Sequence, residues 1–239
     1  MPYTPLPRTA AQLAAARLSD QDKAVYRSFI LVAARVARND LERIYSCILG
    51  YIFLLWPRPE AREAIRRELL AGRRPQIVYR LGAMYWRNLI RVFGREAGPH
   101  SPTLPHPSDS AFDQRMVEIM NELRSSPDDN KISKGKSLER ERYRCFGTDR
   151  RDYRSAMVNL VETKRGDSRA VFTECSHIFP RSLGRIQEGG NGLKEQHVAA
   201  FWTTLERLGH GEIRGELAGR YIHRLENVVT LDTHVHDGF

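Results

Sequence analysis

The sequence contains little cysteine, no long apolar run and fewer acidic than basic residues. Its three cysteines, Cys47, Cys145 and Cys175, are too few and too scattered for a disulfide framework, which favours a reducing, intracellular compartment. The longest apolar run, residues 47–56, has ten residues, whereas a membrane-spanning helix needs roughly twenty. The opening MPYTPLPRTA lacks the apolar core of a signal peptide. We therefore expect a nuclear or cytoplasmic protein that is neither secreted nor held in a membrane.

The charge balance is the first positive signal. The 239 residues include 38 Lys and Arg against 29 Asp and Glu, which gives a net charge of +9. Apolar residues make up 41% of the chain, as is typical of a globular protein with its own core. A positive field of this size favours polyanions, with nucleic acid as the first candidate. A basic surface that binds no anion is the alternative, and charge alone does not choose between the two.

The N-terminal part has the pattern of a helical domain. We expect residues 1–18 to be flexible and residues 19–94 to form four helices. Ser19 and then Asn39 or Asp40 suit helix N-caps, and Pro59 and Pro75 suit first helical positions. Aromatic and aliphatic residues recur between these points at helical spacing, so we interpret them as core. A partner-binding groove is the alternative reading of the same stripe.

Residues 95–136 are expected to form a proline-rich linker with one short helix near residues 112–123. The segment 131–154 then holds nine basic residues against four acidic ones, with Tyr143 and Phe146 among them. Lysine and arginine neutralise phosphates and aromatic rings stack on bases, so this segment is a candidate nucleic-acid surface. A solvated charged face is the alternative. The candidate nucleic-acid-binding residues are Lys134, Lys136, Arg140, Arg142, Arg144 and Arg181.

Chemistry is most plausible after residue 165, where the pattern changes to short strands. The segment RAVFTECSHIFP reads as a strand that ends at Pro180 and carries His177. The segment LENVVTLDTHVH reads as a second strand, with Asn227 before it and two histidines, His234 and His236, after it. An amphipathic helix separates the two strands. A histidine, an asparagine and a further histidine in this order are less often accidental than a lone histidine.

These segments resemble the His-Asn-His (HNH) endonuclease family, in the version found in mushroom-forming fungi. The resemblance rests on ECSHIFP, LENVVTL and HDGF, and on RYRCFGTD at residues 142–149, where Asp149 stands in place of an expected glycine. It extends through the helical block from about residue 40. The resemblance implies an α+β protein, with a helical N-terminal region followed by a ββα-metal nuclease-like domain over residues 137–239.

The resemblance also implies roles for four residues. His177 would be the general base, because a neutral imidazole can take a proton from water. Asn227 would fix the loop or orient His177. His236 would be a metal ligand, joined by Glu174, because Ser176 stands where many HNH nucleases carry aspartate or histidine. The cofactor would be one divalent ion, Mg²⁺, Mn²⁺, Zn²⁺ or Ni²⁺. The implied activity is hydrolysis of phosphodiester bonds in nucleic acid, with DNA the first choice.

Two alternatives stay open. Cys175 and His177, with His234 and His236, could instead form a structural zinc module. The chain could also be an inactive HNH relative that binds nucleic acid or a protein. The sequence ends three residues after His236, so we expect the last helix of the nuclease-like domain to be cut to about one turn. The sequence does not determine the oligomeric state.

Overall fold

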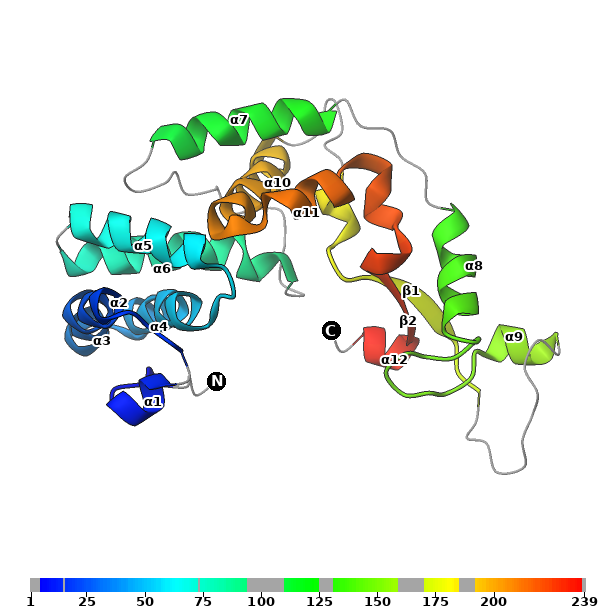
Figure 1. Ribbon diagram of the computed structural model, residues 1–239. Coiled ribbons are helices and arrows are strands. Elements are labelled where there is room, and N and C mark those ends of the chain that lie inside the picture. Colours follow the sequence, from blue (N-terminus) through cyan, green and yellow to red (C-terminus); the bar gives the residue numbers. More distant parts are fainter. Residues whose placement is uncertain are drawn as a thin grey trace. The chain divides into compact units, whose positions relative to one another are not determined.

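The computed structural model describes residues 5–14, 16–72, 74–93, 110–124, 131–158, 170–184 and 192–237. These residues are mostly helical and include one small two-stranded sheet, which agrees with an α+β protein (Figure 1). The chain divides into two compact units. The first contains residues 1–121 and 190–214, and the second contains residues 122–189 and 215–239. Residues 95–109 and 125–130 of the expected linker lie outside the described residues, and α7 (Ser110–Arg124) corresponds to the short helix expected near residues 112–123.

The first unit is built of helices. They are α1 (Ala10–Ala14), α2 (Asp20–Val25), the π-helical η1 (Tyr26–Ile30), α3 (Leu31–Val36), α4 (Asp40–Leu55), α5 (Pro59–Gly72), α6 (Pro75–Asn88), the 3₁₀ turn η2 (Ile90–Phe93), most of α7 (Ser110–Arg124), α10 (Gly192–Leu205), the π-helical η4 (Glu206–His210) and the start of α11 (Gly211–Leu217). The strongest contacts join α4 to α6. A Cβ on Gly82 of α6 would lie 2.1 Å from the carbonyl oxygen of Tyr45, so glycine permits this close packing.

The predicted helix starts are confirmed. The Ser19 hydroxyl accepts a hydrogen bond from the Asp22 N–H at 3.1 Å, and the Asn39 side chain accepts one from the Glu42 N–H at 2.9 Å. Helices α5 and α6 begin at prolines, as expected. The α-helical part of the fourth helix ends at Asn88, and a 3₁₀ turn follows it.

The segment before Ser19, expected to be flexible, is packed in the residues that the structure describes. Leu6, Leu13 and Leu18 are all buried there. The hydroxyls of Tyr26 and Tyr51 donate hydrogen bonds to the carbonyls of Pro7 and Pro5, each at 3.0 Å. Apolar burial and these two bonds hold a stretch whose composition alone suggests mobility.

The boundary expected at residue 137 differs from the observed division. Residues 190–214 belong to the first unit, although their helix was expected inside the nuclease-like domain. Phe201 and Trp202 of α10 are fully buried, and α10 contacts α6. Burial of this apolar face against another helix accounts for the placement.

The second unit contains the only sheet among the described residues. Its elements are α8 (Lys131–Arg140), α9 (Tyr153–Met157), β1 (Thr173–His177), the 3₁₀ turns η3 (Arg181–Leu183), η5 (Gly219–His223) and η6 (Leu225–Asn227), β2 (Val228–Asp232) and α12 (Thr233–His236). The strands are antiparallel, and His177 pairs with Val228. Strand β1 was expected to reach Pro180 but ends at His177, because Asn227 takes over the next two backbone N–H groups.

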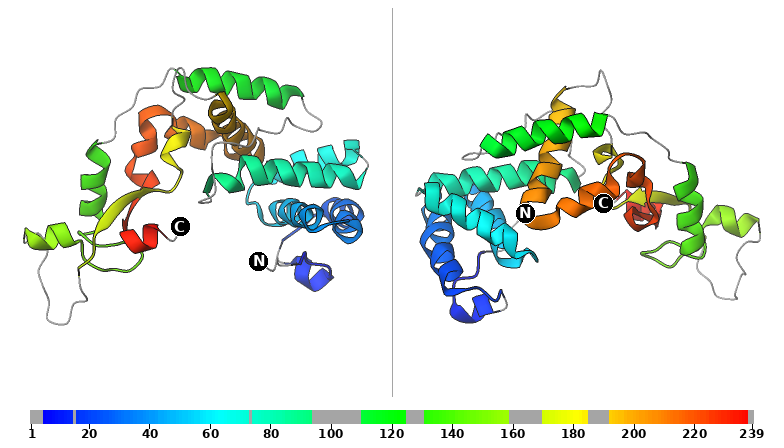
Figure 2. Two further views of the ribbon diagram at one scale, coloured as in Figure 1. Left: turned by 180° about the vertical axis from the view of Figure 1, so that it is seen from behind. Right: turned by 45° about the horizontal axis from the view of Figure 1, so that its top comes forward.

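The antiparallel pair β1 and β2, called the hairpin below although residues 178–227 separate the strands, has different neighbours on its two faces. Side chains alternate along a strand, and residues opposite one another in an antiparallel pair share a face. Cys175, His177 and Thr230 therefore share one face, where the Ser137 hydroxyl of α8 lies 2.9 Å from that of Thr230. Glu174 belongs to the other face, beside α12. Two views show α8 and α12 on opposite sides of the hairpin (Figures 1 and 2).

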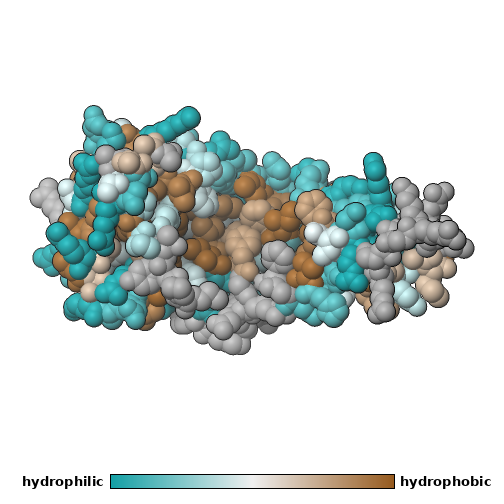
Figure 3. Space-filling view, turned by 90° about the horizontal axis from the view of Figure 1, so that it is seen from below, coloured by the Kyte–Doolittle hydropathy of each residue, from teal (hydrophilic) through white to brown (hydrophobic). Residues whose placement is uncertain are grey.

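The described surface mixes polar and apolar side chains. The face in Figure 3 carries hydrophilic residues interspersed with hydrophobic ones. Phe146 is 71% exposed and Leu55 is 68% exposed, but they belong to different units. Within the described ranges, no helix is long and apolar enough to cross a membrane.

Candidate active site

Two histidines from distant parts of the sequence form a pair in the second unit. The Nε2 atom of His177 lies 2.9 Å from Nδ1 of His223, and the rings meet edge to face with centroids 5.0 Å apart. His223 is only 5% exposed, and His177 is partly buried at the end of β1. One nitrogen of this pair must donate and the other must accept, so the tautomer of each ring fixes that of the other.

The surroundings keep His177 uncharged at neutral pH. The pKa of His177 is lowered to about 4, chiefly by burial and in smaller part by the nearby His223 and Arg181. An imidazole with this pKa is almost entirely neutral at pH 7. One of its two ring nitrogens is therefore a proton acceptor, and the tautomer shared with His223 decides which one.

The position of His223 follows from the contacts of its backbone. The Ser133 hydroxyl of α8 donates to the His223 carbonyl at 2.6 Å. The preceding Ile222 packs against Gly184, where an added Cβ would lie 2.7 Å from the Ile222 Cβ atom. The Gly219 N–H donates to the Gly184 carbonyl at 2.7 Å. These contacts bring η5 beside the turn that follows His177.

Asn227 joins the same two segments. Its side chain is buried, accepts from the Phe179 N–H at 2.8 Å, and donates to the carbonyls of Phe179 at 3.1 Å and Ile222 at 2.7 Å. Its carbonyl accepts from the Ile178 N–H at 2.8 Å. Asn227 thus fixes both the loop after His177 and the residue before His223.

Glu174 and His236 form a second pair, on the other face of the hairpin. Glu174 Oε2 lies 3.3 Å from His236 Nδ1, and both side chains are partly exposed, at 53% and 40%. Asp232 caps α12 by accepting from the His234 N–H at 3.0 Å, which positions the turn that carries His236. Glu174 makes this contact from a regularly paired position of β1, opposite Leu231.

The donor set of this second pair suits a divalent cation. With metal–ligand bonds of about 2.0–2.2 Å, two donors on one ion lie roughly 3 Å apart, close to the observed 3.3 Å. A carboxylate with an imidazole suits Mn²⁺, Zn²⁺ or Ni²⁺ better than Mg²⁺, which prefers oxygen. In the part of the chain that the structure describes, no three His, Cys, Asp or Glu side chains come together. Glu174 and His236 thus fit an ion whose other ligands are water or substrate.

The zinc module is not supported by this arrangement. Cys175 and His177 lie on one face of the hairpin, whereas His236 contacts Glu174 on the other. Burial raises the pKa of the Cys175 thiol, which disfavours the thiolate that zinc requires. No four-ligand set forms among the described residues.

The predicted nucleic-acid-binding residues differ in their surroundings. Lys134 and Lys136 on α8 are exposed, as are Arg142 and Arg181. Arg140 instead donates to the carbonyls of Leu225 and, at 2.6 Å, Val228, which ties α8 to the start of β2. Arg144 donates to the Asp149 carbonyl at 2.8 Å. The last two arginines therefore also support the local fold.

Sequence reasoning assigned no role to His223. His223 lies two residues before the segment LENVVTLDTHVH, outside the residues that were considered. It is separated from His177 by 46 positions, and no spacing rule pairs residues across such a distance. Only the contacts of η5 with Gly184, Ser133 and Asn227 bring the two rings together.

Comparison with known proteins gives one match. Residues 157–239 match the family model HNH_2, described as HNH endonuclease. The matched region includes β1, β2 and α12, and with them both side-chain pairs and Asn227. Neither the curated proteins nor the solved structures yielded a match to this chain.

Proposed function

We propose that this chain, which contains an HNH endonuclease domain at residues 157–239, hydrolyses phosphodiester bonds within nucleic acid with the help of a divalent cation. The observation that carries the proposal is what the matched region contains. It holds two paired strands and a helical turn, with His177 at the end of β1 and His236 on α12. The match by itself supports a nuclease-type function related to nucleic acid. The catalytic roles below go further and are proposals.

His177 is proposed as the general base. A water molecule loses a proton to His177 and forms a bond from its oxygen to phosphorus. The bond from phosphorus to the leaving oxygen then breaks, and that oxygen takes a proton from solvent. The low pKa keeps the ring neutral at pH 7 but also makes it a weak base, so the support for this role comes from the position of His177 and its contact with His223.

His223 is proposed to set the tautomer of His177. If His177 Nε2–H donates to His223 Nδ1, the lone pair of His177 is on its own Nδ1, where it can accept a proton from water. The positive charge that follows is then shared along the hydrogen bond. Asn227 is proposed to hold both segments in place through its three side-chain bonds.

Glu174 and His236 are proposed to hold the cation. Their separation of 3.3 Å and partial exposure support this role, because substrate and water must reach the ion. This pair lies on the face opposite His177, so a cation bound there would act by attracting and neutralising nucleic-acid phosphates, not by binding the water that His177 deprotonates.

The substrate is proposed to be nucleic acid, with DNA tested first. The exposed Lys134, Lys136 and Arg142, together with the net charge of +9, support attraction of a phosphate backbone. Arg181 is exposed at the start of η3, and its charge acts on His177, so it is proposed to meet the phosphate near the general base.

The deciding experiment is nicking of supercoiled plasmid by purified protein with Mg²⁺, Mn²⁺, Zn²⁺ or Ni²⁺. Wild type should cleave with at least one ion, and His177→Ala should not. His234→Ala is the matched control, because this exposed histidine lies outside both pairs. Folded wild-type protein that cleaves neither DNA nor RNA with any of these ions would contradict the proposal and favour a binding-only protein.

A further inference from the structure

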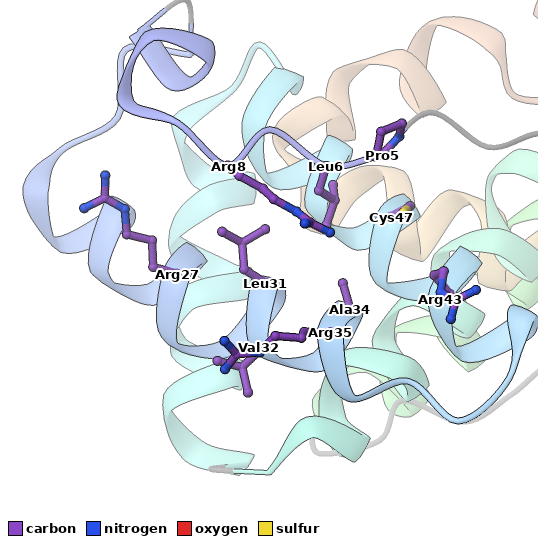
Figure 4. A pocket seen from close by; sticks show the side chains of 10 residues that line it. All are labelled: Pro5, Leu6, Arg8, Arg27, Leu31, Val32, Ala34, Arg35, Arg43 and Cys47. Carbon is purple, nitrogen blue, oxygen red and sulfur yellow. The ribbon is translucent and has the colours of Figure 1, made fainter.

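A pocket in the first unit has the composition of an anion-binding site. It has a volume of about 370 Å³, within the usual range for small-ligand sites. Four of its ten lining residues are arginines, Arg8, Arg27, Arg35 and Arg43, and none is acidic (Figure 4). In that view Arg27 and Arg43 lie at opposite ends of the pocket, and Arg8 reaches over its centre beside Leu6. Apolar side chains make the rest of the wall, namely Pro5, Leu6, Leu31, Val32, Ala34 and Cys47.

The wall of this pocket is held by specific contacts. The N-terminal segment crosses α4, where Tyr51 donates to the Pro5 carbonyl, and Tyr26 donates to the Pro7 carbonyl. Leu6 between them is buried against Gly50, where an added Cβ would lie 2.5 Å from Leu6 Cδ2. The backbone before Arg8 is therefore fixed on both sides of Leu6, so Arg8 starts from a defined position.

The positive charge in the pocket is largely uncompensated. Arg43 pairs with Asp40 at 3.1 Å, but Arg8, Arg27 and Arg35 form no ion pair with any residue that the structure describes. Burial raises the pKa of the Cys47 thiol, so that group adds no negative charge. Three exposed arginines without an ion pair among the described residues thus line one partly apolar hollow.

In a second pocket of the same unit, acidic side chains balance the charge of the arginines. It has about 570 Å³ and is lined by Arg62, Arg66 and Arg67 together with Asp22, Glu60 and Glu63. Arg66 pairs there with both Asp22 and Glu63. The larger pocket is therefore electrically balanced, and it offers an anion no comparable attraction.

We infer that the arginine pocket binds one nucleotide unit, with its phosphate on the guanidinium groups and its base on the aliphatic wall. Guanidinium groups bind phosphate through paired N–H donors, and a flat base buries its faces against apolar side chains. A phosphate alone would leave the apolar wall unused, and a nucleoside alone would leave the arginines unused.

This inference rests on the proposed function in one respect. Other phosphorylated molecules with an apolar part would also suit the pocket, and a nucleotide is chosen because the chain is proposed to act on nucleic acid. Two sources share the chemistry, a free nucleotide and an unpaired nucleotide of a nucleic-acid strand. A free nucleotide should bind as well as a strand end if the pocket takes the single unit alone. Tighter binding of a 5′-phosphorylated single-stranded oligonucleotide would indicate that the strand is the source.

The test is calorimetric titration of the full chain with 2′-deoxyadenosine 5′-monophosphate at low salt. We expect saturable binding, with inorganic phosphate and 2′-deoxyadenosine each at least about tenfold weaker, because each lacks one half of the contact. A double variant, Arg8→Gln with Arg35→Gln, should bind the nucleotide at least about tenfold less tightly. The matched control changes Arg67 and Arg74, two exposed arginines outside the pocket, to glutamine and should bind as wild type does.

A second variant separates the pocket from general electrostatic attraction. Ala34→Phe fills the hollow and leaves every arginine in place, so it should abolish nucleotide binding. Unchanged binding in Ala34→Phe, or an equal loss in the control, would overturn the inference. The outcome is distinct from that of the nuclease test, because binding is measured without cleavage. His177→Ala should lose cleavage and keep nucleotide binding.

Discussion

His177 and His223 are joined through ring nitrogens 2.9 Å apart, and neither ring can change tautomer without the other. His223 is 5% exposed, so solvent does not readily replace it as the partner. The proposed catalytic roles of the hairpin depend on this relationship. If His177 donates through Nε2, as proposed, this contact leaves its Nδ1 lone pair free to accept a proton.

Replacement of His223 should separate positioning from packing. Asparagine places an amide near the position of the histidine Nδ1 atom, so His223→Asn should keep much of the cleavage activity. His223→Leu fills the space without a partner for His177 and should lower kcat by about 100-fold, within the range of general-base effects. Rates of plasmid cleavage and thermal unfolding of both variants give the comparison. Equal rates in both variants would show that the hydrogen bond is not used.

The pH dependence of cleavage should follow the low pKa of His177. Because that pKa is about 4, cleavage should persist well below pH 6.5 and fall as the pH approaches 4. A profile of kcat/KM against pH from 4 to 8 measures this. A decline centred near 6.5 would mean that His177 titrates like an exposed histidine.

The same pKa shift has a consequence for stability. The unfolded chain takes up a proton on His177 below about pH 6.5, whereas the folded protein does so only near pH 4. The folded state therefore loses stability as the pH falls through this window. Unfolding of His177→Gln should depend less on pH between 6.5 and 4 than unfolding of wild type, as measured by denaturant titration. Parallel curves for the two proteins would contradict the shift.

Asn227 should contribute strongly to the stability of the second unit. Asn227→Ala leaves the Phe179 N–H and the Ile222 carbonyl without their partner, and each unpaired buried group costs about 1–3 kcal/mol. We expect a loss of about 2–4 kcal/mol in the free energy of unfolding. His234→Ala, at an exposed position, should change it by less than about 0.5 kcal/mol. Denaturant titration of both variants gives the result. A loss below about 1 kcal/mol for Asn227→Ala would show that the side-chain hydrogen bonds of Asn227 contribute little to stability.

Cation binding can be measured apart from activity. Electron paramagnetic resonance of Mn²⁺ titrated with the full chain should report bound ion in wild type and much less in Glu174→Gln or His236→Ala. His234→Ala should bind as wild type does, because the structure places only His236 against Glu174. Undiminished Mn²⁺ binding in both variants would show that Glu174 and His236 are not the cation ligands.

A pair of glycine substitutions tests the close contact of α4 with α6. Gly82→Ala would bring Cβ to 2.1 Å from the Tyr45 carbonyl oxygen, so the helices must separate. We expect a loss of about 3 kcal/mol or more in the free energy of unfolding. Gly135 is an exposed position of α8, and a Cβ there would meet nothing within 4 Å. Gly135→Ala should raise the free energy of unfolding by about 0.5–1 kcal/mol through helix propensity. Thermal unfolding of each variant checks the opposite signs, and a neutral Gly82→Ala would contradict the packing.

Local chemistry allowed the sequence to determine much of the secondary structure. Ser19 and Asn39 bond to N–H groups three positions ahead, so their role follows from neighbouring residues alone. The same holds for Pro59 and Pro75 as helix starts. The sequence also indicated the HNH resemblance through short segments, and the family match over residues 157–239 confirms it.

Tertiary structure decided which side chains meet. Placement of Glu174 with His236, and of His177 with His223, depends on strand register and on contacts across 46 or more positions. Strand alternation then separates the two pairs onto opposite faces, which no single spacing in the sequence specifies. Residues 190–214 likewise pack with the first unit, where Phe201 and Trp202 are buried. Local propensities act within a few residues, whereas packing free energy is summed over surfaces that the chain brings together only when it folds.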